Sequence, residues 1–168
     1  MNSKALHSIS YGLYVVTSKK NGEGNGQIAN TVFQVASQPP LVAVSINKQN
    51  LTHEYINASG VFAVSVLSKD TPLPFIGRFG FKSGREINKL ESVNFKIGRT
   101  GVPIVLDNTL AWLEVEVKGE LDVGSHTLFV SEIVDANVLT GGEPMTYAYY
   151  RLVKRGGTPK TAPVHAEG

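Results

Sequence analysis

Short apolar segments separated by glycine, proline and asparagine run along the whole chain, a pattern typical of β-structure. Residues 41–46 form a nearly continuous apolar run, as expected of a strand that is buried on both faces. Pro39 and Pro40 end the strand before it, because proline cannot donate a hydrogen bond into a sheet. Strands are predicted at residues 9–18, 28–35, 41–46, 61–67, 110–121, 126–138 and 147–153.

The segment 110–121 alternates between apolar and charged positions, which predicts a strand with two different faces. One face carries Ala111, Leu113, Val115 and Val117, and the other carries Glu114, Glu116 and Lys118. Short helices are predicted at residues 51–57, stopped by Gly60, and at residues 72–78. The intervening residues 21–26 and 122–125 are predicted as turns, and residues 79–85 as a loop.

This succession of short strands predicts a mainly β fold with a few short helices. Because the strands do not alternate with long helices, an antiparallel barrel that is closed or partly closed is favoured over a doubly wound parallel sheet. Side chains fill the interior of so small a barrel, so a bulky ligand is expected outside it or between two subunits. We expect one domain at residues 1–154, followed by an arm or flexible tail, rich in proline and glycine, at residues 155–168.

Composition narrows the range of functions. A net charge of +2 without a long charge run does not indicate a nucleic-acid partner. The chain has no cysteine, which excludes disulfides, thiol chemistry and cysteine-bound zinc or iron–sulfur clusters. The four histidines, at positions 7, 53, 126 and 165, lack metal-ligand spacing, so no metal site is expected.

The N-terminal segment lacks the apolar core and the cleavage site of a signal peptide. No apolar run is long enough to cross a membrane. We therefore expect a cytoplasmic protein without a membrane partner.

The start of the predicted helix at residues 51–57 is a candidate anion site. Lys48, Asn50 and Thr52 gather an ammonium, an amide and a hydroxyl at a helix N-terminus, which favours negative charge. In the alternative interpretation, Asn50 is only an N-cap and Lys48 only a solvated charge. Taken alone, these residues are more typical of the alternative.

Four segments in order resemble the FMN-binding split-barrel proteins of the flavin reductase type, both small NAD(P)H:FMN oxidoreductases and flavoredoxin-like proteins. The segments are QIANTVFQVASQPPLVAVSINKQNLTHEYI, FGFKSGREINK, GSHTLFVSEIVDA and PMTYAYYRLVKRGGTPKTAP. The resemblance implies an antiparallel split β-barrel of Greek-key type that holds FMN without a covalent link. It also implies NADH or NADPH as electron donor, and a homodimer with the flavin near the subunit interface.

The resemblance also implies which residues bind the cofactor. The isoalloxazine ring would lie along residues 27–31, and residues 47–52 would hold the phosphate. The loop 81–85 would close over the other side, and Lys89 would help with the phosphate. The residues expected at the cofactor are Gln27, Ala29, Asn30, Thr31, Ser45, Asn47, Lys48, Asn50, Thr52, Phe81, Ser83, Gly84, Arg85 and Lys89.

Two positions depart from the pattern of the family. Ser125 stands where the family often has an aspartate before the histidine at position 126. Asn88 stands where the family tends to have an aspartate before the lysine at position 89. In relatives the histidine lies near the nicotinamide or the flavin, which makes His126 a candidate catalytic residue. Because the neighbouring carboxylate is absent, two roles of His126 stay open: a catalytic residue near the nicotinamide or the flavin, and an ordinary strand residue.

Four functions compete. The first is an NAD(P)H-dependent FMN reductase, and the second is an FMN-containing electron carrier that passes electrons to a redox protein partner. Both use the same pocket, and neither needs a nucleophile or base from the protein, because the flavin itself accepts the hydride. A barrel that binds single-stranded nucleic acid is less favoured, since Trp112 is the only tryptophan and aromatic residues make up 8% of the chain. A different planar cofactor, such as pyridoxal phosphate or haem, is the fourth.

Overall fold

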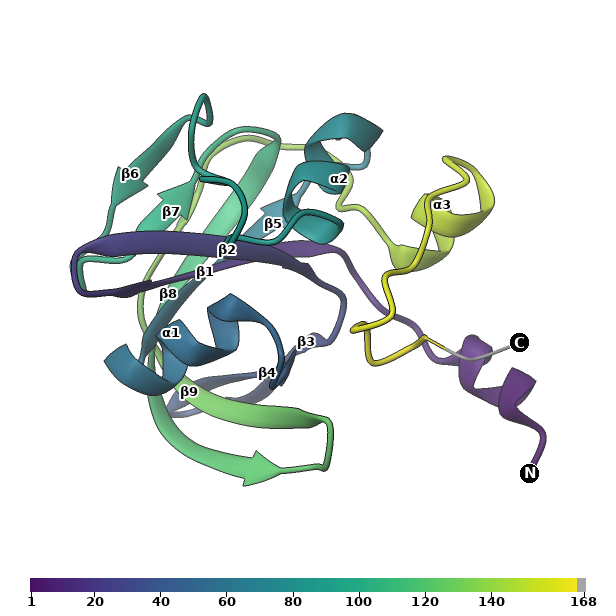
Figure 1. The fold of residues 1–168 in the computed structure, drawn as a ribbon, viewed down its shortest axis with the longest axis horizontal. Coiled ribbons are helices and arrows are strands. Elements are labelled where there is room, and N and C mark those ends of the chain that lie inside the picture. The colour runs from purple at the N-terminus through teal and green to yellow at the C-terminus, as the bar shows by residue number, and fades with distance from the viewer. Residues whose placement is uncertain (166–168) are drawn as a thin grey trace.

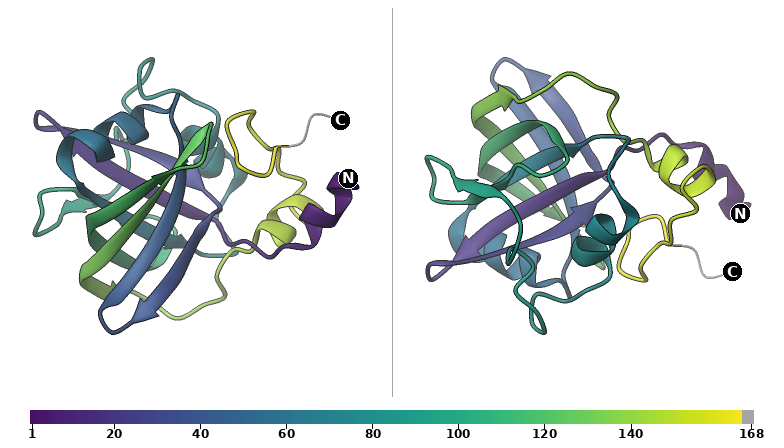
Figure 2. Two further views of the ribbon diagram at one scale, coloured as in Figure 1. Left: turned by 90° about the horizontal axis from the view of Figure 1, so that it is seen from below. Right: turned by 90° about the horizontal axis from the view of Figure 1, so that it is seen from above.

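The computed structural model describes residues 1–165, which form a seven-stranded antiparallel sheet and a separate pair of short strands (Figures 1 and 2). The strands of the large sheet are β1 (Tyr14–Lys20), β2 (Glu23–Ala29), β3 (Val32–Ser37), β4 (Pro40–Asn47), β5 (Val61–Leu67), β8 (Thr109–Asp122) and β9 (His126–Val138). The short pair is β6 (Phe95–Ile97) and β7 (Pro103–Val105). The helices are the 3₁₀ helix η1 (Ser3–Ser8), α1 (Leu51–Ser59), α2 (Leu73–Gly80) and α3 (Tyr147–Leu152).

The sheet curls so that its two edges come together. The strand order is β2-β1-β5-β8-β9-β4-β3, so the edge strands β2 and β3 follow each other directly in the chain. Only Asn30 and Thr31 separate these two strands, and the backbone N–H of Ser45 on β4 donates to the Thr31 carbonyl at 3.1 Å. The predicted mainly β, antiparallel split barrel is therefore confirmed.

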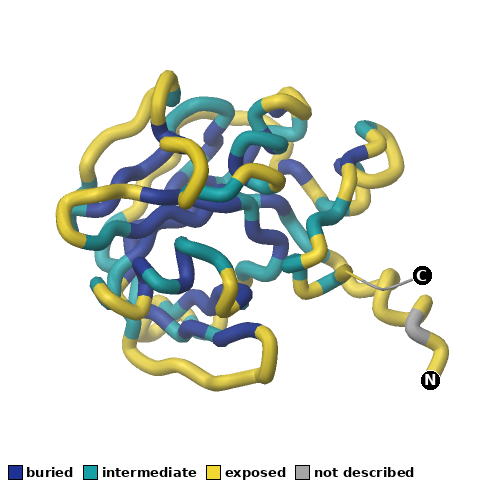
Figure 3. The backbone as a smooth tube through the Cα atoms, viewed as in Figure 1, coloured by how far each residue is buried: buried dark blue, intermediate teal, exposed yellow. Residues whose placement is uncertain are grey.

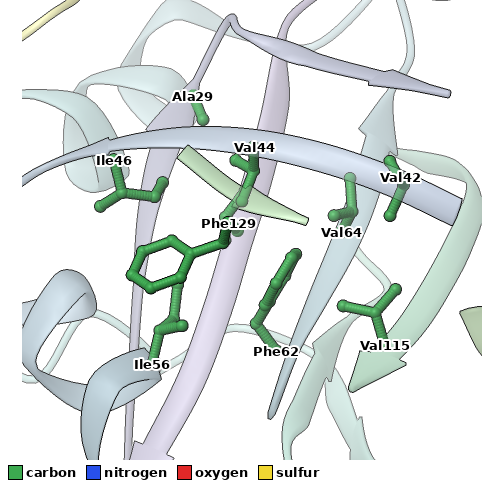
Figure 4. Packing of buried hydrophobic residues seen from close by; sticks show 10 residues of the cluster. Ala29, Val42, Val44, Ile46, Ile56, Phe62, Val64, Val115 and Phe129 are labelled. Carbon is green, nitrogen blue, oxygen red and sulfur yellow. The ribbon is translucent and has the colours of Figure 1, made fainter. Parts of the chain in front are cut away.

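Aliphatic and aromatic side chains fill the interior of the barrel, as the small barrel size predicts (Figure 4). Figure 3 marks in dark blue the backbone of the buried residues. Phe62, Phe129 and Ile56 pack at its centre, with valines from four strands around them. The buried members of this cluster are Val16, Ala29, Val42, Val44, Ile46, Ile56, Phe62, Val64, Val115 and Phe129. No large ligand fits among them, so a bulky ligand must bind outside the barrel.

A second apolar cluster lies between the outer face of the sheet and the helices α2 and α3. Val15 and Leu67 come from β1 and β5, whose opposite faces belong to the barrel interior. Ile76 and Phe79 come from α2, and Tyr150 comes from α3. These contacts fix both helices beside one end of the barrel, where they border the cavity described below.

The segment 147–153 is not the predicted strand but helix α3. The Thr146 side chain accepts a hydrogen bond from the Tyr149 N–H at 3.1 Å and so caps the helix start. Tyr147 and Tyr150 then fall three residues apart on one face, which packs against the second cluster. The prediction was wrong because the aromatic residues suggested a strand, whereas the cap and the spacing indicate a helix.

Other boundaries also differ from the prediction. The first strand begins at Tyr14, after helix η1, and the predicted strand 28–35 is two strands interrupted at Asn30 and Thr31. The predicted turn 21–26 is a two-residue hairpin loop, since Asn21 and Gly22 both adopt positive φ and Lys20 pairs with Glu23. Strands β6 and β7 were not predicted, because three residues are too few to show a period. Strands β5 and β9, and the stop of α1 at Gly60, are confirmed.

The side chain of Glu114 is fully buried, whereas Glu116 and Lys118, which the alternating pattern places on the same face of β8, are exposed. The Glu114 carboxylate accepts hydrogen bonds from the backbone N–H groups of Arg99 and Thr100 at 3.0 and 2.5 Å, and from the Thr100 hydroxyl at 2.6 Å. Glu114 therefore fixes the turn between β6 and β7 to the barrel.

We expect Glu114→Ala to lower the free energy of unfolding by about 2–5 kcal/mol, because two backbone N–H groups and the Thr100 hydroxyl lose their acceptor. Chemical denaturation monitored by the fluorescence of Trp112 measures the change. Glu116→Ala, two positions along the same strand but exposed, is the control and should stay within about 0.5 kcal/mol of the parent. Equal stability of Glu114→Ala and the parent would contradict this role.

Candidate functional site

A cavity of about 480 Å³ lies outside the barrel, a volume typical of a small-molecule site. Its wall combines β2, the end of β4, the start of α1 and the end of α2 with the loop that follows α2. Residues 157–163, which we call the C-terminal strap, form the remaining side. In Figures 1 and 2 this segment passes from α3 back toward the barrel.

Most of the residues predicted at the cofactor line this cavity. The predicted residues in its wall are Gln27, Ala29, Asn30, Ser45, Asn47, Asn50, Thr52, Phe81, Ser83, Gly84, Lys89 and His126. They come from five separate segments of the chain, so the fold brings together what the sequence keeps far apart. Their roles toward a cofactor stay predictions.

The other three predicted residues, Thr31, Lys48 and Arg85, are not part of the wall. The ammonium of Lys48 lies 2.7 Å from the carboxylate of Asp122, and the guanidinium of Arg85 lies 3.3 Å from that of Glu54. The hydroxyl of Thr31 donates to the side-chain oxygen of Asn30 at 3.1 Å. Both cations therefore have acidic partners of their own, and any role at a cofactor stays a prediction.

The N-terminus of α1 opens into the cavity. Asn50 occupies the N-cap position, but its side chain makes no capping bond and instead donates to the Gln27 side-chain oxygen at 3.1 Å. The first intrahelical hydrogen bonds run from the N–H groups of His53 and Glu54 to the Asn50 carbonyl. The N–H groups of Leu51 and Thr52 precede them in the chain and so have no acceptor within the helix. Unpaired amides and the helix dipole together make this end favourable for an anion.

Thr52 is fully buried at the same end of the helix. Its hydroxyl oxygen accepts a hydrogen bond from the Asn25 side-chain amide at 2.8 Å, which leaves the hydroxyl proton able to donate into the cavity. The loop after α2 passes so close that a Cβ at Gly84 would collide with the Asn25 side chain. Sequence reasoning missed Asn25, although a buried asparagine within a strand is itself an unusual feature.

Lys89 is 5% exposed, and its ammonium donates to the Phe79 carbonyl at 3.0 Å. Burial lowers the pKa of this ammonium to about 8. A carbonyl neutralises no charge, so an anion in the cavity would stabilise the protonated form of Lys89. Lys89 is therefore a buried cation of the cavity wall without a carboxylate partner among the described residues, whereas Lys48 and Arg85 have carboxylate partners. Lys82 and Lys160 also line the cavity.

The rest of the wall is largely apolar and aromatic. Leu13, Ile28, Ile76 and Phe79 come from the second cluster, and the ring of Phe81 is half exposed at the rim. The cavity thus has an apolar side next to polar side chains from β2 and β4. This combination suits a planar ring with a polar edge and an anionic tail.

Both ring nitrogens of His126 are hydrogen bonded. Nδ1 lies 2.8 Å from the Ser125 hydroxyl, and Nε2 lies 3.1 Å from the Thr161 carbonyl of the strap. Burial lowers the pKa of His126, and the Thr161 carbonyl opposes this in part. The ring is therefore neutral near pH 7.

Three further contacts fasten the residues around the strap to α3. The Tyr150 hydroxyl donates to the Gly157 carbonyl at 2.8 Å, and the Arg151 guanidinium donates to the Gly156 carbonyl at 2.8 Å. The hydroxyls of Tyr147 and Thr158 also bond to each other. Within the described part of the predicted tail, residues 155–165, the strap is thus packed on the cavity, while residues 166–168 lie outside the described range.

Within residues 1–165, no helix combines the length and the apolar character needed to span a membrane. The same residues contain no group of three or more potential ligands that could hold a metal ion. The cytoplasmic location stays a prediction.

Comparison with known proteins agrees with this geometry. A family model described as flavin reductase like domain matches residues 6–156. A high molecular weight rubredoxin of Moorella thermoacetica is 55% identical over the whole chain, which covers 73% of that protein. A ferric-chelate reductase (NAD(P)H) of Archaeoglobus fulgidus is 53% identical over 99% of both chains.

Among solved structures, an NADH:FAD oxidoreductase of Streptomyces globisporus C-1027 in complex with NAD and FAD fragments superposes with a TM-score of 0.75. Its sequence is 27% identical, and the match covers 84% of this chain and 83% of that one. The predicted resemblance is confirmed: the chain belongs to the flavin reductase-like domain family.

Proposed function

We propose that this protein is an NAD(P)H-dependent oxidoreductase of the flavin reductase type that holds one FMN per subunit without a covalent link. The observation that carries the proposal is the cavity outside the barrel, which joins an open helix N-terminus and a buried lysine to an apolar wall. Family membership and the NAD(P)H-dependent relative at 53% identity support the reaction class.

The donor groups of the cavity fit FMN. The N–H groups of Leu51 and Thr52, the Thr52 hydroxyl and the Lys89 ammonium would hold the phosphate. Gln27 and Asn30 would face the polar edge of the isoalloxazine ring from β2, and Phe81 would border its apolar part. When bound, the flavin supplies the acceptor for a hydride, so the protein needs no acid or base for that transfer.

The remaining residues of the site act on access and orientation. The strap covers one side of the cavity and limits the entry of water. The neutral ring of His126 directs an N–H group at the strap, and this N–H is available to a ligand that moves the strap aside. The nicotinamide of NADH or NADPH would take this side of the cavity.

A second candidate function differs only in the electron acceptor. In a flavin reductase the acceptor is free flavin or a small substrate, whereas in the electron-carrier alternative bound FMN passes electrons to a redox protein. The full-length similarity to a ferric-chelate reductase favours another acceptor, a ferric chelate. Each of these acceptors would use the same flavin site.

We further propose a homodimer. The barrel interior is filled, so a second wall for a large ring system must come from outside the barrel, and a partner subunit can supply it. The edge strand β3 leaves Phe33 and Val35 about half exposed, at 48% and 49%. An exposed apolar sheet edge is a surface that proteins usually cover.

Reconstitution tests the proposed function directly. The purified protein should bind FMN with a change in the flavin absorption spectrum, and it should then oxidise NADH or NADPH. Adding a ferric chelate should raise the steady-state rate if the chelate is the acceptor. A protein that binds FMN but oxidises neither nucleotide would be the electron carrier, and a protein that binds no flavin would contradict both functions.

Thr52→Val should weaken FMN binding by about tenfold to a hundredfold, the range expected for a charge-assisted hydrogen bond. Riboflavin, which lacks the phosphate, is the matched control, and its affinity should not change. Fluorescence titration with both flavins measures the difference. Equal losses for FMN and riboflavin would show that Thr52 does not act on the phosphate.

Sedimentation equilibrium of the FMN-loaded protein should give twice the mass of the chain. Phe33→Glu should shift the mass toward that of a monomer, because it places a charge on the apolar edge. Ile97→Glu on β6, which is 63% exposed, is the control and should leave the mass unchanged. A monomer that binds FMN tightly would refute the dimer.

A further inference from the structure

The partners of His126 determine which of its nitrogens carries the proton. The Thr161 carbonyl oxygen can only accept a hydrogen bond, so Nε2, 3.1 Å away, must carry a proton. In a neutral ring Nδ1 is then an acceptor, and the Ser125 hydroxyl, 2.8 Å away, must donate to it. The two contacts are therefore compatible with a single neutral tautomer.

The backbone fixes Ser125 in the position that this bond needs. The Lys48 N–H donates to the Ser125 carbonyl at 3.0 Å, which ties the turn to the end of β4. Gly124 adopts a φ of 88°, and its N–H donates to the Asp122 carboxylate at 2.8 Å. The turn is thus held at Gly124 and Ser125, and the hydroxyl of Ser125 lies next to the ring of the following residue.

We propose that Ser125 is a positioning residue that keeps His126 in the neutral tautomer with the proton on Nε2. The ring then presents one hydrogen-bond donor to the cavity, suited to a carbonyl oxygen. In the structure described here this oxygen belongs to Thr161 of the strap, and an amide carbonyl of a ligand would take its place. Only this last step rests on the proposed function, in which the ligand is a nicotinamide.

The charged groups around the ring do not change this assignment. Lys48 and Asp122, from the β4–α1 loop and from β8, pair with each other at 2.7 Å. His53 on α1 is bonded to the Thr127 hydroxyl at 2.8 Å, and burial lowers its pKa, so it is neutral near pH 7. Lys160 of the strap also borders the cavity. Among the described residues no carboxylate contacts the imidazole, and the Thr161 carbonyl, which favours its cationic form, only partly offsets the effect of burial.

A carboxylate at position 125 would reverse the situation. It can only accept from Nδ1, so Nδ1 would carry a proton, and the Thr161 carbonyl already requires one on Nε2. With both nitrogens protonated, the ring is a cation. A carboxylate before His126 would thus favour the cationic ring, whereas the serine hydroxyl can donate to Nδ1 and so support the neutral form.

Nitrogen-15 NMR of histidine-labelled, flavin-free protein tests the assignment without any activity. In the parent, the Nδ1 resonance of His126 should be that of an unprotonated acceptor and Nε2 that of a protonated nitrogen, with titration below the ordinary histidine pKa. Ser125→Thr, which keeps a hydroxyl, should preserve this spectrum. Ser125→Ala should lose the Nδ1 hydrogen-bond signature, and Ser125→Asp should raise the pKa by about one to two pH units.

A parent spectrum with the proton on Nδ1, or a Ser125→Ala spectrum equal to that of the parent, would overturn the proposal. The KM for the nicotinamide nucleotide, measured on FMN-loaded protein, tests the ligand step. In each protein its change with pH should follow the His126 pKa that NMR gives, so that in Ser125→Asp the change occurs at a higher pH than in the parent. A KM that does not change at this pKa would refute the ligand step. A parent protein that oxidises neither nucleotide would refute the proposed function, and the NMR spectra alone would then test the role of Ser125.

Discussion

The barrel interior is filled by its own side chains, and this constraint decides where chemistry can occur in the molecule. Phe62, Phe129 and the valines around them leave no space for a ring system inside. A ligand site must therefore be assembled on the outside, from whatever elements the fold places there. The curled sheet, whose edges are joined at Asn30 and Thr31, brings the ends of β2 and β4 together, and α1 begins directly after β4.

Among the basic residues predicted at the site, the buried Lys89 lines the cavity, whereas Lys48 and Arg85 do not. Lys48 and Arg85 are the basic residues that a motif search would choose first, yet both have carboxylate partners at the surface. Exposed pairs of this kind contribute little energy but keep the cation away from other ligands. Lys89 has only a carbonyl, and its lowered pKa records the cost of keeping an ammonium buried without a counter-ion. An anionic ligand would offset that cost.

Long, regular segments could be predicted from the sequence, and short or polar ones could not. Strands β5 and β9 and the stop of α1 at Gly60 followed from periodicity and from a glycine with positive φ. Helix α3 was mistaken for a strand, because its tyrosines outweighed the cap at Thr146. Twelve of the fifteen residues predicted at the site line the cavity, but Asn25 and the strap were not predicted there. Asn25 acts through Thr52, 27 positions away, and such contacts exist only in the folded chain.

The two halves of the cavity differ in how firmly they are held. The inner half belongs to β2, β4 and α1, which are tied into the sheet and packed on the barrel core. The outer half consists of the loop after α2 and the strap, which are held mainly by side-chain contacts such as those of Tyr150 and His126. Segments with few backbone hydrogen bonds open at lower free energy than core strands. Ligand exchange therefore requires only the outer half to move, while the anion site at α1 and the strand beside it keep their geometry. In the outer half, the N–H group of His126 contacts the strap, and in the proposed function a ligand would compete with the strap for it.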